Sequence, residues 1–195
     1  FAKHALDALT VHARTVTQMY RLPVHYDLIR RAAETLKCPV IANGHVYSAV
    51  QAQELLIQTR ARGLMIGRGV IRSPWLFNQI RQQLRGEPVT FPTGREVFGY
   101  IEALWESQAS FDAPEKIQCE RMKKFMNYLG EGVTGDFLHR IRRSQTRAEF
   151  FSICAEFFNH DEPMRLEPVA KSEAPQSAQT DSQNGDETCV SGASC

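Results

Sequence analysis

A strand–helix alternation in the first 85 residues constrains the fold more than any other feature of this sequence. Short apolar runs at residues 8–12, 38–42 and 64–66 are each followed by a segment with apolar residues at helical spacing. This repeat predicts parallel strands joined by right-handed crossovers, in an α/β sheet or barrel. Because three strands cannot close an eight-stranded barrel, we expect that further strands lie upstream of Phe1.

Polar side chains cluster directly after each predicted strand. His12 and Arg14 follow the first strand, Asn43 and His45 follow the second, and Arg68 follows the third. The carboxyl ends of parallel strands meet at one edge of a sheet, and this edge carries the site in α/β proteins. We therefore expect these side chains to gather around one ligand.

The third strand leads into a glycine-rich turn, Gly67-Arg68-Gly69. Glycine lets the backbone come close to a bound group, and a guanidinium offers a planar fork of donors that suits a phosphate. Ser73 and Pro74 predict the start of a helix, with the serine at the N-cap. Strand, turn and helix N-terminus would together form an anion site. An ordinary turn with a solvated arginine is the alternative.

The composition of the chain changes at Gly86. Residues 86–94 are rich in proline and glycine, which predicts a linker. Residues 95–165 show helical periodicity only, with the apolar residues on one face of each helix, so we predict a small helical bundle domain. Residues 166–195 have almost nothing to bury and are predicted to be a disordered tail. Residues 1–85 would then form the partial barrel.

Positive charge is concentrated in one part of the predicted helical region. Residues 116–147 contain eight Lys and Arg against three Asp and Glu, although the whole chain has a net charge of only +1. A polyanion would bind there if anywhere, and a solvated helical face is the alternative. The basic residues that we single out are Lys123, Lys124, Arg140, Arg142 and Arg143.

Cysteine usage and hydropathy exclude several classes of protein. The five cysteines are odd in number and lack C-x-x-C spacing, so neither a disulfide framework nor a metal site is expected. No apolar run approaches the ~18 residues of a membrane span. The first eight residues do not resemble a signal peptide, and we expect a piece of a longer protein. A monomer in the reducing cytoplasm is the simplest prediction.

Four segments in register resemble the tRNA-dihydrouridine synthases. They are Leu9-Thr-Val-His-Ala-Arg-Thr15, Pro39-Val-Ile-Ala-Asn-Gly44, Met65-Ile-Gly-Arg-Gly69 and Pro74-Trp-Leu-Phe77. The resemblance covers about residues 1–160 and corresponds to the C-terminal half of that family. It implies the last three strands of a TIM (β/α)8 barrel, followed by an all-α domain that binds tRNA. Such enzymes hold FMN, which NADPH reduces, and they reduce the C5=C6 bond of a uracil in tRNA.

The resemblance also implies roles for individual residues. It assigns His12 to the flavin ring and Arg14 to the surroundings of the substrate uracil. The remaining cofactor-binding positions are Asn43, Gly44 and His45 in the turn after strand seven, and Gly67 and Arg68 in the phosphate turn after strand eight. The family usually has an aspartate where this chain has His45.

The resemblance places the catalytic centre partly outside this sequence. The general-acid cysteine and the active-site lysine of the family lie upstream, so we expect no catalytic residue in this chain. Cys38 is no substitute, because it precedes a strand and lies at the wrong end for the site. The chain alone is therefore expected to be inactive, and its unpaired strand edges would leave it insoluble or molten.

Two other functions remain open from the sequence. One is a different FMN-dependent barrel oxidoreductase, although such an enzyme has no need for the helical domain. The other is a non-catalytic RNA-binding remnant. Tyr20 and Arg21, in a long loop expected at residues 13–25, could stack on RNA or pack against the barrel.

Overall fold

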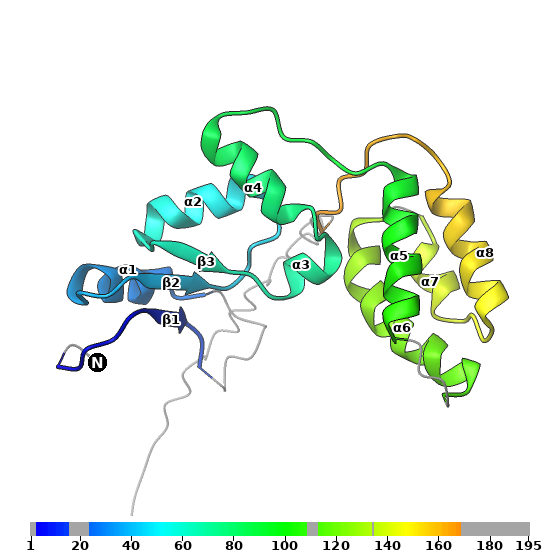
Figure 1. The fold of residues 1–195 in the computed structure, drawn as a ribbon, viewed down its shortest axis with the longest axis horizontal. Helices are drawn as coiled ribbons and strands as arrows, with labels where there is room; N and C mark the ends of the chain where they lie inside the picture. The colour runs from blue at the N-terminus through cyan, green and yellow to red at the C-terminus, as the bar shows by residue number, and fades with distance from the viewer. Residues whose placement is uncertain (1–2, 16–23, 109–112, 134, 169–195) are drawn as a thin grey trace, which may run out of the picture.

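The computed structural model describes residues 3–15, 24–108, 113–133 and 135–168 (Figure 1). The predictions for Tyr20, Arg21 and most of the tail fall outside these residues. The elements of the first part are β1 (Leu9–His12), α1 (Tyr26–Thr35), β2 (Val40–Asn43), α2 (Ala49–Thr59), β3 (Gly63–Met65), α3 (Arg68–Arg72) and α4 (Leu76–Arg85). The second part contains α5 (Gly94–Gln108), α6 (Glu115–Leu129), the 3₁₀ helix η1 (Gly130–Gly132), α7 (Phe137–Ile141) and α8 (Arg147–Phe158).

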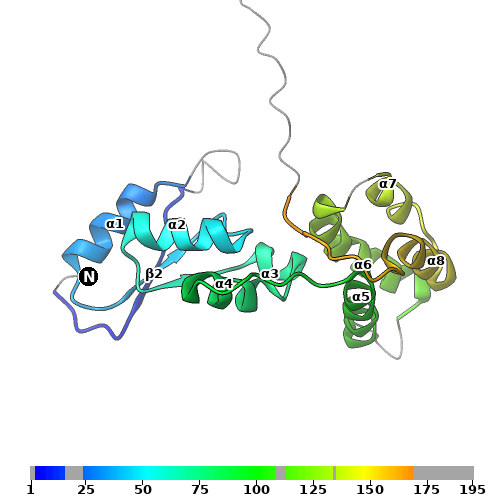
Figure 2. The same ribbon diagram turned by 90° about the horizontal axis from the view of Figure 1, so that it is seen from above.

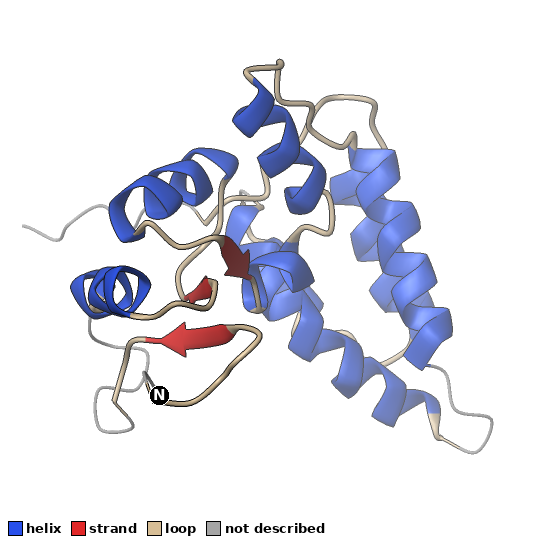
Figure 3. Ribbon diagram, turned by 60° about the vertical axis from the view of Figure 1, so that its left-hand side comes forward, coloured by secondary structure: helices blue, strands red, loops and turns tan. Residues whose placement is uncertain are grey.

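The three strands form one parallel sheet in the order β1-β2-β3 (Figure 3). Helix α1 connects β1 to β2, and helix α2 connects β2 to β3. Parallel strands require such crossovers, since a tight turn cannot bring the chain back to the same end of the sheet. The predicted α/β fold with parallel strands and helical crossovers is confirmed.

Successive side chains of the strands point to opposite faces of the sheet. Val40 and Ala42 are buried in a core that includes Ile29 of α1 and Leu55 of α2. The strand register sets two rows on the other face, Thr10–Ile41–Gly63 and His12–Asn43–Met65. Thr10, His12 and Met65 are exposed, so this face lies open among the described residues.

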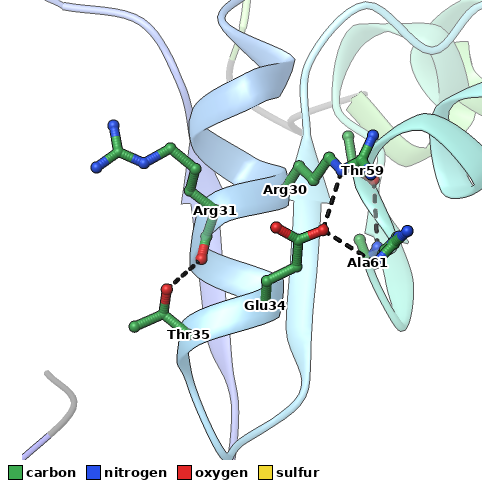
Figure 4. A network of polar contacts seen from close by, with 7 residues as sticks. Arg30, Arg31, Glu34, Thr35, Thr59 and Ala61 are labelled. Carbon is green, nitrogen blue, oxygen red and sulfur yellow. Dashed lines mark hydrogen bonds and ion pairs between the residues drawn. The ribbon is translucent and has the colours of Figure 1, made fainter.

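Helix α2 is fixed at both ends by polar contacts. Ser48 and Gln51 have the sequence spacing of a capping box. Ser48 Oγ accepts from Gln51 N at 3.1 Å, and Gln51 Oε1 accepts from Tyr47 N, one residue before the N-cap, at 3.1 Å. At the other end, Glu34 of α1 accepts from Arg30 Nε and pairs with Arg60, both at 3.0 Å (Figure 4). Arg60 follows the last residue of α2, so this carboxylate holds α1 against the end of α2.

The turn after β3 differs from the expectation. The short helix α3 begins directly after Gly67, and Ser73 ends it as a buried C-cap residue. Ser73 is therefore not the N-cap of the next helix, and Trp75 occupies that position in α4 without a side-chain cap. The reason is a tertiary contact: Gly69 packs against the backbone of Val46 so closely that a Cβ atom would collide with its carbonyl oxygen.

Helices α5 to α8 surround a second hydrophobic core. Its fully buried residues include the aromatic side chains Phe137, Phe150 and Phe158. The Phe137 and Phe158 rings meet edge to face, with centroids 5.1 Å apart. The residues with helical periodicity therefore form helices that each bury one face. That these helices form a separate bundle domain stays a prediction.

Helix α3 joins the two parts of the molecule (Figure 2). The Nε of Arg72 donates to Tyr128 O at 2.8 Å, and its guanidinium also pairs with Glu131. Tyr100 of α5 donates its hydroxyl proton to Ile71 O at 3.1 Å. Both helix α5 and the end of helix α6 are therefore fastened to the residues that follow β3.

The segment after α8 returns along the predicted linker. Thr93 and Pro163 form an antiparallel bridge, and Met164 N donates to Pro92 O at 2.7 Å. Leu166, which was expected to belong to a disordered tail, is only 4% exposed and packs in the second core. The ordered part of the chain therefore extends beyond the predicted boundary, because this segment has an apolar residue to bury.

Candidate functional site

Polar contacts tie the carboxyl ends of the three strands together. His12 Nδ1 lies 3.3 Å from Asn43 O, and Asn43 Nδ2 donates to Met65 O at 2.8 Å. The Tyr26 hydroxyl, which comes from α1, donates to Gly44 O at 3.4 Å. The first two contacts link each strand end to its neighbour, and the third ties α1 to the turn after β2, so His12 and Asn43 are held at the same edge of the sheet.

A hollow of about 370 Å³ lies at this edge. Its lining residues are Thr10, His12, Arg14, Asn43, Gly44, His45, Val46, Tyr47, Met65, Ile66, Gly67, Arg68 and Gly69. The structure thus brings together all the residues that the sequence placed after the three strands. Pockets of ~300–1,000 Å³ are typical of small-ligand sites, and the identity of the ligand stays a prediction.

Glycine is required at one of the turns that shape the hollow. Gly44 has φ +135°, a backbone conformation that other residues rarely adopt. A Cβ atom there would also lie 2.9 Å from a methyl group of Val24. The Asn43-Gly44 turn can therefore pass this close to Val24 only because Gly44 has no side chain.

The hollow is positively charged. Arg14 and Arg68 both contribute to it, and no carboxylate occurs among its lining residues in the described part of the chain. The pKa of His45 is lowered, first by partial burial of its ring and then by the positive charges of Arg14 and Arg68. Part of the side chain still reaches solvent. These groups suit an anionic ligand.

Sequence reasoning missed several residues around the hollow. Thr10 and Met65 line it because they lie on the same open face of the sheet as His12 and Asn43, a signal that period-two counting could have found. Tyr47 also lines it, and the Arg72 guanidinium lies 4.8 Å from the centre of the Tyr47 ring. The only sequence signal for Arg72 is its spacing, one helical turn after Arg68.

The predicted basic residues of the helical part lie in varied surroundings. Lys123 is only 9% exposed and pairs with Glu120, so it does not belong to the basic surface. The other contacts are Arg140 with both carboxylate oxygens of Glu156, Arg142 with Asn127, and Arg143 with His139. Lys124 is exposed. Arg142, Arg143 and His139 line a shallow hollow of about 560 Å³.

The cysteines of the described residues lie away from the strand ends. Cys38 precedes β2 and so lies at the amino end of that strand, opposite the hollow, as the sequence indicated. Cys119 and Cys154 are buried in the second core. Across the described ranges, no group of His, Cys, Asp and Glu is arranged to hold a metal ion, and no helix is long and apolar enough to cross a membrane.

The parallel sheet with helical crossovers defines an α/β protein, and the charged hollow at its carboxyl edge is a candidate ligand site. The comparison with sequence families gives a more specific assignment. The family model described as "Dihydrouridine synthase (Dus)" matches residues 2–158. This chain belongs to the dihydrouridine synthase family.

Individual relatives agree with this assignment. The chain is 30% identical to a tRNA-dihydrouridine(16) synthase of Neisseria meningitidis over 76% of its own length and 45% of the relative's. It is 38% identical to tRNA-dihydrouridine synthase B of Pasteurella multocida, covering 66% of this chain and 39% of the relative. A probable tRNA-dihydrouridine synthase of Rickettsia conorii is 35% identical, with 66% and 34% covered. The chain therefore spans less than half the length of these relatives.

Proposed function

We propose that this chain provides the C-terminal half of a flavin-dependent tRNA-dihydrouridine synthase. In this proposal, residues 1–85 are the last three strand–helix units of a TIM (β/α)8 barrel, and residues 95–165 are a tRNA-binding domain behind the linker at 86–94. The observation that carries the proposal is the hollow where His12, Asn43 and Arg68 meet at the ends of adjacent strands. Family membership and the names of the relatives support it.

The chemistry of the hollow fits FMN as the cofactor. A terminal phosphate would be held by the Gly67-Arg68 turn, which brings a guanidinium to the hollow, and no carboxylate among the described lining residues opposes an anion. In barrels of this kind, the turns after the last two strands are frequent phosphate sites. FMN reduced by NADPH would supply the hydride for the uracil C5=C6 bond.

The residues of this chain would bind and orient the reactants. From the end of β1, His12 would contact the flavin ring through Nε2, since its Nδ1 faces Asn43 O, and Asn43 would keep the neighbouring turn in place through its bond to Met65 O. Arg14 would lie beside the uracil. None of the described cysteines lines the hollow, so we assign the general acid to a segment outside this sequence.

The helical part would bind the tRNA backbone. Arg142 and Arg143 border the shallow hollow at α7, and the exposed Lys124 lies on α6. Contacts between such side chains and phosphates carry much of the affinity for nucleic acid and make it salt-dependent. Other flavin-dependent barrel enzymes have no need for these helices, so a requirement for them would distinguish the proposed function from the functions of those enzymes.

The experiment is a comparison of Arg68→Ala with Arg62→Ala in the intact protein that contains this sequence. Arg62 is exposed at the opposite end of the same strand and serves as the control. Loss of a charge-assisted phosphate contact of about 1.5–3 kcal/mol predicts flavin binding weaker by about ten- to a hundredfold in Arg68→Ala. Absorbance of the retained flavin measures this, and dihydrouridine formation in tRNA measures activity.

The outcomes discriminate among the candidate functions. A yellow protein that forms dihydrouridine supports the proposal, and equal flavin retention in the two variants would remove Arg68 from the phosphate site. A colourless, inactive protein that still binds tRNA in a salt-dependent manner would favour the RNA-binding remnant. A yellow protein without affinity for tRNA at low salt would favour a flavin enzyme with another substrate.

A further inference from the structure

His45 lines the candidate site beside Arg14, which follows β1. It occupies the turn after β2 with a left-handed backbone, φ +49°, which directs its ring toward the end of β1. There its Nε2 atom contacts Nη2 of Arg14. The ring also packs edge to face against Tyr47, with centroids 5.6 Å apart and planes at 66°.

The contact with Arg14 determines the protonation state of His45. A guanidinium has five N–H donors and no acceptor, so the imidazole nitrogen that faces it must carry a lone pair. His45 is therefore neutral in this arrangement, with its proton on Nδ1. A protonated ring would present N–H donors on both nitrogens and would repel Arg14.

Among the described residues that line the hollow, none has a carboxylate that could offset a positive charge added to His45. The titratable and charged groups near it are Arg14 and His12 from the end of β1, Arg68 from α3, Tyr47 from its own turn, and Tyr26 from α1 beside Arg14. Three of these are basic, and no carboxylate lines the hollow among the described residues. The lowered pKa of His45 agrees with this environment.

We propose that neutral His45 is a positioning residue, which holds Arg14 in place over the hollow and releases it on taking up a proton. The pair itself follows from the geometry alone. That Arg14 then acts on the uracil end of the substrate rests on the proposed function.

The first experiment tests the pair without any need for activity. The pKa of His45 is measured by NMR titration of its imidazole in the intact protein, in Arg14→Gln and in the control Arg62→Gln. Removal of Arg14 is expected to raise the pKa of His45 toward its ordinary value, because one repulsive charge is lost, and Arg62→Gln is expected to leave it in place. An unchanged pKa in Arg14→Gln would overturn the proposal.

The second experiment tests the consequence for tRNA. We expect kcat/KM to fall by up to about tenfold for each unit of pH below the pKa of His45, measured from about pH 5.5 to about pH 8. His45→Asn keeps an acceptor at every pH and should lose this acid limb, whereas the exposed control His4→Asn should keep it. Above the pKa of His45, His45→Leu should lower kcat/KM by about tenfold, and this variant should also lack the acid limb.

The two experiments fail in different ways. An acid limb that persists in His45→Asn would overturn the positioning role even if the pair exists. A protein with no reductase activity, but with the expected pKa change in Arg14→Gln, would instead refute the proposed function and leave the pair intact.

Discussion

Single residues determine how closely the loops around the candidate site approach one another. Gly69 allows α3 to pack against the carbonyl oxygen of Val46, and Gly44 allows the turn after β2 to pass Val24. Neither position has room for a methyl group. The shape of the hollow therefore depends on missing side chains as much as on the charged ones.

Replacement of Gly69 tests this packing. Gly69→Ala is expected to lower the free energy of unfolding by about 1–3 kcal/mol, because the added methyl group collides with backbone that cannot rotate away. The matched control is Gly99→Ala in α5, where a Cβ atom meets nothing within 4 Å and helix propensity should stabilise the protein by about 0.8–1 kcal/mol. Denaturant midpoints of the two variants should move in opposite directions, and equal shifts would contradict the argument.

At the scale of elements, local signals predicted most of the fold. Apolar spacing indicated α1, α2 and the helices of the second part, and Ser48 with Gln51 marked the start of α2 correctly. Helix α3 was missed, because it depends on the contact of Gly69 with a loop far away in sequence. The prediction that Ser73 is an N-cap was wrong for the same reason, because tertiary packing places Ser73 at the C-terminal end of α3.

The helices α6 and α8 bury two thiols that illustrate the tight packing of the second core. Burial raises the pKa of Cys154 from 9 to about 12, and the pKa of Cys119 is raised chiefly by the same cause. Alkylation requires the thiolate. We expect iodoacetamide to modify the partly exposed Cys38 in the folded protein and to modify the two buried thiols only after unfolding, as peptide mass spectrometry would show.

The raised pKa of Cys154 also predicts a dependence of stability on pH. Above about pH 9 the thiol ionises in the unfolded chain but stays protonated in the folded protein until about pH 12. The free energy of unfolding should therefore fall as the pH rises through this window. Cys154→Ala should reduce this slope, and an equally steep decline in that variant would assign the effect to other groups.

At the scale of the whole molecule, Arg72 is the principal link between the two cores. Its side chain is 3% exposed, it bonds to Tyr128 O and Glu131, and it stacks on Tyr47 at the rim of the hollow. Sequence reasoning found the strand ends, since α/β topology fixes where they meet. It could not find this link or the Arg14–His45 pair, because such contacts depend on the relative placement of distant segments.

Removal of the Arg72 charge tests the link. Arg72→Met keeps the length of the side chain but leaves Tyr128 O and Glu131 without their partner, so we expect a loss of about 1.5–3 kcal/mol in the free energy of unfolding. Arg85→Met is the control, since Arg85 is 67% exposed and its pair with Glu87 spans 3.8 Å. The control should change stability by less than about 0.5 kcal/mol. Equal denaturant midpoints for the two variants would show that the contacts of Arg72 do not stabilise the protein.

The bond from Arg72 to Tyr128 connects residues 56 positions apart in the chain. The two pairs of neighbouring strands join over shorter separations, such as the 31 positions between His12 and Asn43. Loop-closure entropy delays contacts between distant residues. Each core can therefore collapse and settle first, and the bond that Arg72 makes to Tyr128 across the two cores would close last.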